Sequence, residues 1–173
     1  SALKIGFDFS LISFEELTNG NIVKALKHVK VSDNKEIGIY RGWMLTPKQY
    51  QNLYEELLQK NIELINSPTE YKHCHYLPES YHKIESKTRK SNWTTNLNDS
   101  TVLKLTEEFG KSPIIIKDFV KSEKHNWEDA CFIPNASDSN KVNAIVDQFL
   151  KLRGGALNNS ILTIFKSFIN SNF

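Results

Sequence analysis

The first 66 residues of the chain contain short segments in which apolar and polar residues alternate as in strands. These segments are 3–9, 25–31, 36–41 and 62–66. Between the last two, apolar residues recur at helical spacing over 47–60, with Thr46 as N-cap and Pro47 as first helical residue. Asn61 ends the predicted helix. A strand, a helix and a strand in this order predict a βαβ unit whose strands run parallel.

The residues from 67 onward predict a second mixture of helices and strands. Residues 67–91 have weak periodicity, which is typical of short helices and loops. The elements predicted after them are a helix at 99–109, a strand at 113–120, its hairpin partner at 130–133, a helix at 138–152 and a strand at 161–169. The expected fold class is therefore α/β (α+β), with two lobes at residues 1–82 and 83–173.

Composition narrows the class of protein. With 39% hydrophobic and 11% aromatic residues, and with few glycines and prolines, the chain is neither collagen-like nor disordered. No apolar run approaches the roughly 20 residues that cross a bilayer, and the N-terminus is not a signal peptide. We therefore expect a soluble, cytoplasmic protein without a membrane partner. A net charge of +2 gives no general reason for nucleic-acid binding.

The sharpest chemical feature is a lysine that follows three isoleucines in the predicted strand 113–120. Strand alternation places Ile115 and Lys117 on one face, and Lys121 continues that face further on. A buried ammonium group is costly unless a partner or a ligand meets it. Two lysines lining one cleft would bind a polyphosphate. The alternative is an edge strand whose lysines lie in water and pair with Asp118 and Glu123.

Histidines and cysteines near the middle of the chain raise the possibility of a metal site. His73, Cys74 and His75 are consecutive, and adjacent residues of an extended segment point to opposite sides. We therefore expect structural histidines and no metal site. Cys131 lies between apolar residues, which favours a buried, inert thiol over a nucleophile.

Four blocks of sequence occur together in one order. They are 40–45 (YRGWML), 73–78 (HCHYLP), 117–122 (KDFVKS) and 130–134 (ACFIP). With these blocks, residues 10–169 resemble the ATP-grasp superfamily, in particular the clade named for one arginine and two lysines. The resemblance implies a pre-ATP-grasp α/β lobe followed by an incomplete ATP-grasp lobe, with ATP held between β-layers.

The resemblance also implies a reaction. Enzymes of this superfamily typically phosphorylate a carboxylate with ATP, and an amine or a thiol then attacks the acyl phosphate while ADP is released. The implied function is an ADP-forming carboxylate–amine ligase, or a part of one. Its partners would be a nucleotide, a carboxylate and an amine, and the sequence leaves the identities of the last two open.

Four of the implied nucleotide-binding residues lie in or after the strand at 113–120. By position in the family, Lys117 resembles the strand lysine that meets the α- and β-phosphates of ATP. Lys121, Lys124 and His125 occupy the place of the loop that covers the phosphates.

The other implied binding residues lie elsewhere in the sequence. Lys166 and Phe168 belong to a segment that resembles the strand lining the adenine edge, and we expect this strand on the wall of the cleft opposite Lys117. Arg89 and Arg41 are rival positions for the signature arginine of the clade.

Two departures from the family affect the expected activity. The adenine strand lacks the usual acidic residue or glutamine, and only residues 170–173 remain where the family places its magnesium ligands. We therefore expect ATP as the cofactor, with magnesium only when segments absent from this chain are present. Residues 1–173 alone should bind ATP weakly and show no ligase turnover. The chain would be a fragment of a larger ligase or a naturally shortened relative.

Two alternative functions remain open from the sequence. One is a shortened, non-catalytic ATP-grasp relative that serves as a binding or interaction module, in a phage or toxin–immunity setting. The other is a nucleic-acid-associated protein that uses Trp93, Trp127 and the lysine-rich segment 83–90. The near-neutral charge and the lack of a recognised binding motif make nucleic acid the weaker hypothesis.

Overall fold

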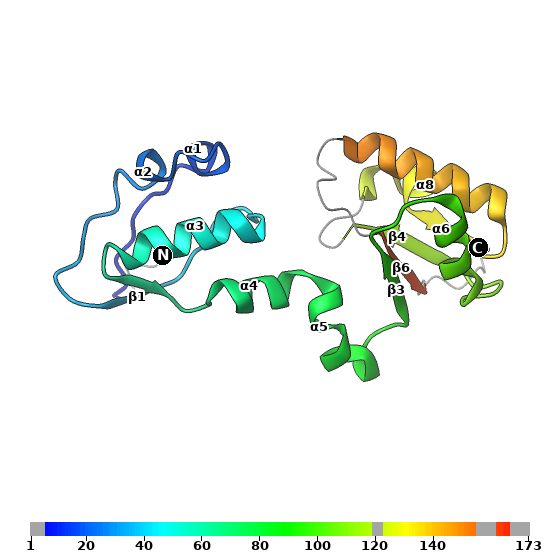
Figure 1. Ribbon diagram of the computed structural model, residues 1–173, viewed down its shortest axis with the longest axis horizontal. Helices are drawn as coiled ribbons and strands as arrows, with labels where there is room; N and C mark the ends of the chain where they lie inside the picture. The colour runs from blue at the N-terminus through cyan, green and yellow to red at the C-terminus, as the bar shows by residue number, and fades with distance from the viewer. Residues whose placement is uncertain (1–5, 119–122, 155–161, 167–173) are drawn as a thin grey trace. The chain divides into compact units, whose positions relative to one another are not determined.

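The computed structural model describes residues 6–118, 123–154 and 162–166 and divides the chain into two compact units, Ser1–Cys74 and His75–Phe173 (Figure 1). Helices and small sheets occur in both units, as the α/β (α+β) class predicts. The division falls eight residues before the boundary expected at 82/83. That expected boundary would cut α5 (Leu77–Ile84) near its C-terminal end.

The first unit is built around a βαβ unit, as predicted. Its elements are α1 (Phe14–Thr18), α2 (Ile22–Ala25), β1 (Glu36–Gly38), α3 (Pro47–Leu58), β2 (Ile62–Leu64) and α4 (Pro68–His75), the last of which ends one residue beyond the unit. Strands β1 and β2 pair in parallel, with Glu36 opposite Ile62. Thr46 and Gln49 form a capping box at the start of α3, and Asn61 has a positive φ of 61° after its end.

Two predicted strands of the first unit are wrong where the structure describes them. Of segment 25–31, Ala25 ends α2, and Ala25, Leu26 and Val29 are buried. Residues 26–28 form a turn after α2, so these buried side chains come from the end of a helix and the segment that follows it, not from a strand. In segment 3–9, residues 1–5 lie outside the described residues, and residues 6–9 form no strand.

The second unit contains a four-stranded antiparallel sheet. Its elements are α5, η2 (Glu85–Lys87), β3 (Ser91–Thr94), α6 (Asp99–Glu107), β4 (Ile114–Lys117), η3 (Lys124–Asn126), α7 (Trp127–Ala130), β5 (Phe132–Ile133), α8 (Ser139–Arg153) and β6 (Leu162–Lys166). The strand order is β3-β6-β4-β5. The sheet contains the three predicted strands and also β3, which the sequence pattern did not reveal.

This strand order corrects two expectations about β4. It has a paired neighbour on each side, so the alternative of an edge strand is wrong. Strand β6, expected on the opposite wall of a cleft, instead pairs directly with β4, with Ile116 opposite Ile164. A strand that pairs with its neighbour continues the same layer and cannot form a facing wall.

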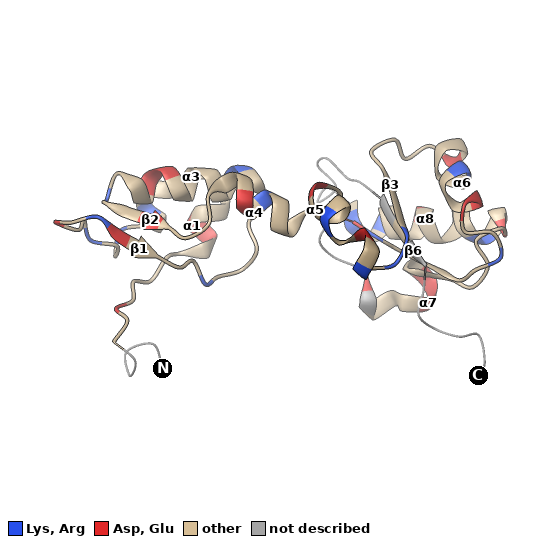
Figure 2. Cartoon of the chain, turned by 90° about the horizontal axis from the view of Figure 1, so that it is seen from below, with Lys and Arg blue, Asp and Glu red and all other residues tan. Residues whose placement is uncertain are grey.

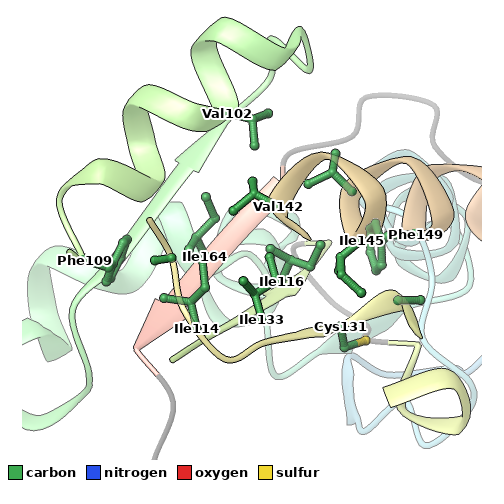
Figure 3. Packing of buried hydrophobic residues seen from close by; sticks show 13 residues of the cluster. Val102, Phe109, Ile114, Ile116, Cys131, Ile133, Val142, Ile145, Phe149 and Ile164 are labelled. Atoms are coloured by element: carbon green, nitrogen blue, oxygen red, sulfur yellow. The ribbon is translucent and has the colours of Figure 1, made fainter. Parts of the chain in front are cut away.

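Helices α6 and α8 cover one face of this sheet (Figure 1). Val102 of α6 and Phe149 of α8 are buried against Ile114, Ile116 and Ile164, and all five residues are at most 1% exposed. Figure 3 shows this cluster between the helices and the strands. Among the described residues, the fully buried isoleucines of the sheet therefore lie on the side that faces these helices.

Charged residues of both signs occur on each of the two units (Figure 2). Lys35 pairs with Glu63 at 2.5 Å in the first unit, and Lys90 pairs with Glu108 at 2.6 Å in the second. Within the ranges that the structure describes, no helix has the length and apolar character needed to cross a membrane.

The buried face of β4 predicts a difference between two neighbouring isoleucines. Ile116→Ala should lower the free energy of unfolding of the second unit by about 2–5 kcal/mol, because it leaves a cavity in a fully buried core. Ile115→Ala, at a partly buried position on the other face, should cost less. Urea unfolding followed by circular dichroism measures both, and equal losses would contradict the assignment of the two faces.

Candidate functional site

The second face of the four-stranded sheet carries the lysine singled out by the sequence. Along β4, Ile114 and Ile116 are buried, whereas Ile115 and Lys117 are only partly buried. The predicted alternation is thus confirmed. Lys117 lies opposite Thr163 of β6, and Thr163 lies opposite Trp93 of β3. Paired residues of antiparallel strands share a face, so Lys117 and Trp93 belong to one cross-strand row, about 10 Å apart.

Aromatic rings lie on both edge strands at this face. On β3, Trp93 meets the ring of Tyr81 from α5 edge-on, with centroids 5.2 Å apart. The Tyr81 hydroxyl accepts a hydrogen bond from the Ser91 backbone N–H at 3.1 Å. On β5, Phe132 lies opposite Ile115 in register, and its ring stacks on that of Trp127 at 5.9 Å. Aromatic side chains therefore lie on both sides of Lys117, one set toward each edge of the sheet.

The environment of Lys117 favours an anionic ligand. Burial lowers the pKa of the Lys117 ammonium group below its ordinary value, and the neighbouring Asp118 carboxylate offsets part of that shift. Removing a cation from water weakens its hydration and strengthens its attraction to a nearby anion. A phosphate group is an anion of this kind, and aromatic rings can stack on a purine base.

Arg153, which the sequence pattern did not single out, lies at the end of α8 and contacts the residue that follows Lys117. It bonds the carboxylate of Asp118 through Nη2 and that of Glu123 through Nη1, the latter at 3.2 Å. Its only sequence signal is its place between the end of the helix predicted at 138–152 and Gly154, whereas in the structure it is the last residue of α8. Its partners lie 35 and 30 residues away in the chain, where local pattern gives no information.

The two arginines expected from the resemblance lie in different units. Arg41 is exposed and follows β1 in the first unit. Arg89 is exposed and precedes β3 in the second, where its backbone carbonyl accepts a hydrogen bond from the Ser91 hydroxyl at 2.9 Å. Neither arrangement identifies the signature arginine, and both assignments stay predictions.

The other expected binding residues are described in part. His125 is exposed in η3, which Lys124 begins. Lys166 is the last residue of β6 and lies opposite Ile114 in register. Lys121 and Phe168 lie outside the described residues, so the expected pairing of Lys117 and Lys121 in one cleft stays a prediction.

The histidines and cysteines singled out by the sequence lie in different surroundings. The described part of the chain contains no group of three or more His, Cys, Asp or Glu side chains arranged to hold a metal ion. His73 and His75 belong to α4 and not to an extended segment. Cys131 is fully buried, and burial raises the pKa of its thiol, as a structural role requires. Cys74 is exposed, and both cysteines are free thiols.

Comparison with known families finds one match. Residues 106–172 match the ATP-grasp domain of the clade named for one arginine and two lysines, in its family 3. The matched segment begins in the last turn of α6 and includes β4, β5, α8 and β6, and therefore also Lys117 and Arg153. No curated protein matches the chain.

The contrast between the two cysteines predicts their reactivity. Cys74 should react at once with Ellman's reagent, whereas Cys131 should react at least about 100-fold more slowly, because its thiol must first be exposed by local or global opening. The release of thionitrobenzoate follows both phases, and Cys74→Ser should remove only the fast one. A fast reaction of Cys131 in the folded Cys74→Ser variant would contradict its burial.

Proposed function

We propose, because residues 106–172 match an ATP-grasp domain, that the chain binds ATP on the partly buried face of its four-stranded sheet. We further propose that it forms part of an ADP-forming carboxylate–amine ligase that acts through an acyl phosphate. The observation that carries the proposal is Lys117, a partly buried ammonium group on the central strand β4 of the matched segment.

This face offers a charged group for the phosphates of a nucleotide and aromatic surface for its base. Lys117 offers a partly desolvated positive charge to the phosphates. Trp93, Phe132 and Trp127 offer aromatic surface within the same sheet and its α7 connection. Binding sites for small molecules commonly combine an apolar surface with a few polar groups that fix orientation.

The proposed reaction has two steps. A carboxylate oxygen of the first substrate attacks the γ-phosphorus of ATP, the bond to the β,γ-bridging oxygen breaks, and ADP leaves. The amine nitrogen of the second substrate then attacks the carbonyl carbon of the acyl phosphate, and inorganic phosphate leaves as an amide forms. Phosphoryl transfer depends mainly on positioning and on electrostatic stabilisation, and Lys117 would contribute to both.

Magnesium, which the family implies, has no set of ligands in the described residues. The role proposed for Lys117 is to hold and orient the phosphates, and it requires only the side chains of this sheet.

The first test is the affinity for ATP. Lys117→Met should weaken ATP binding at least tenfold, which corresponds to about 1.4 kcal/mol, because it removes the charge that meets the phosphates. Lys111→Met removes one positive charge from an exposed turn of the same unit and serves as the control. Isothermal titration calorimetry of both variants gives the comparison. Unchanged affinity of the Lys117→Met variant would place the phosphates elsewhere.

The ligase chemistry needs a separate experiment. The polypeptide encoded by the complete reading frame is incubated with ATP, magnesium and a panel of carboxylic acids and amines, and ADP release is recorded. ADP formation that requires both an acid and an amine is the expected result. Saturable ATP binding without ADP formation would contradict the ligase and favour the alternative, a non-catalytic binding module.

A further inference from the structure

Arg153 joins two carboxylates that lie on either side of a short connection. Asp118 immediately follows Lys117 at the end of β4, and Glu123 immediately precedes η3. The guanidinium group bonds one carboxylate through each terminal nitrogen. Because Arg153 is the last residue of α8, it ties both points to a helix whose apolar residues are fixed in the core.

The three side chains are largely withdrawn from solvent. Those of Arg153, Asp118 and Glu123 are 18%, 15% and 21% exposed. Within the described residues, Nε of Arg153 is buried and has no hydrogen-bond partner. Such an arrangement contributes little net stability compared with well-packed apolar residues, because the charges must be desolvated. The fixed fork of a guanidinium group does, however, define where its two carboxylate partners lie.

Glu123 in turn defines the start of the next elements. Its backbone carbonyl accepts a hydrogen bond from the Asn126 N–H at 2.8 Å, which closes η3. Trp127 follows directly and stacks on Phe132 of β5. The position of Glu123 therefore affects the aromatic side of the candidate site, and the position of Asp118 affects the lysine beside it.

We propose that Arg153 is a positioning residue that holds the Lys117 end of β4 and the start of η3 at a fixed separation, and so preorganises the site for nucleotide phosphates. This inference rests on the proposed function as far as the nucleotide is concerned. Arg153 acts through Asp118 and Glu123, and its contacts in the structure are with these carboxylates. Preorganised groups bind tighter because less ordering is needed on binding.

The experiment compares Arg153→Met and Arg153→Lys with Lys151→Met, which removes an exposed charge from the same last turn of α8. Hydrogen exchange followed by mass spectrometry reports on the fold, and calorimetry reports on ATP binding. Arg153→Met should speed exchange in peptides that cover 123–131 at least tenfold while leaving β3 and α6 unchanged. It should also weaken ATP binding at least tenfold. Arg153→Lys, with a single ammonium group for two carboxylates, should fall between.

A second variant separates positioning from general stability. The triple change D118N/E123Q/R153M removes the two carboxylates that Arg153→Met would leave unpaired, so it should recover thermal stability. Without the guanidinium group, the end of β4 and the start of η3 stay unlinked, so fast local exchange and weakened ATP binding should persist.

Three results have different consequences. Recovery of the ATP affinity of the unsubstituted chain by the triple variant would overturn the positioning role, and so would faster exchange spread evenly over the whole second unit. If the unsubstituted chain binds no ATP, the proposed function fails. In that case, hydrogen exchange in the peptides that cover 123–131 still decides whether Arg153 holds Asp118 and Glu123 at a fixed separation.

Discussion

The burial of one face of the four-stranded sheet determines where the chemistry of this chain can lie. Ile114, Ile116 and Ile164 are fully buried under α6 and α8, so the alternate positions of the same strands must lie on the other face. This constraint places Lys117 in a row with Trp93, although the two residues are 24 positions apart in sequence. A shift of β4 by one residue would turn the lysine into the core, where its charge has no compensation. The packing of α8 therefore fixes the register on which the proposed site depends.

The same helix connects the core to the site. Its apolar positions Val142, Ile145 and Phe149 are buried, and its last residue, Arg153, meets Asp118 and Glu123. Core packing thus fixes the position of α8, and α8 positions the guanidinium group of Arg153. This group in turn holds Asp118 after β4 and Glu123 before η3. Each step rests on a different kind of interaction, from apolar burial to a forked pair of charge-assisted hydrogen bonds.

Local signals made much of the fold predictable, and non-local pairing explains the rest. The capping residue Thr46 and the turn at Asn61 mark α3 in the sequence, and the βαβ unit follows from them. Strand β3 has four residues and is fixed mainly by its pairing with β6, which no local pattern records. The place of Lys117 on one face of β4 was predictable because three isoleucines precede it in one strand. Arg153 was not, because its role depends on partners brought together only by folding.

The three tryptophans of the chain offer a direct measurement of whether nucleotide binds on the lysine-bearing face of the second unit. Trp93 and Trp127 lie on or beside this face, whereas Trp43 is exposed in the first unit. Their three indole N–H signals can be assigned in ¹⁵N NMR spectra by single Trp→Phe substitutions and followed during an ATP titration. Binding on this face predicts saturable shifts of the Trp93 or Trp127 signal, or of both, with the Trp43 signal unmoved. Saturable binding that shifts only Trp43, or none of the three, would contradict it.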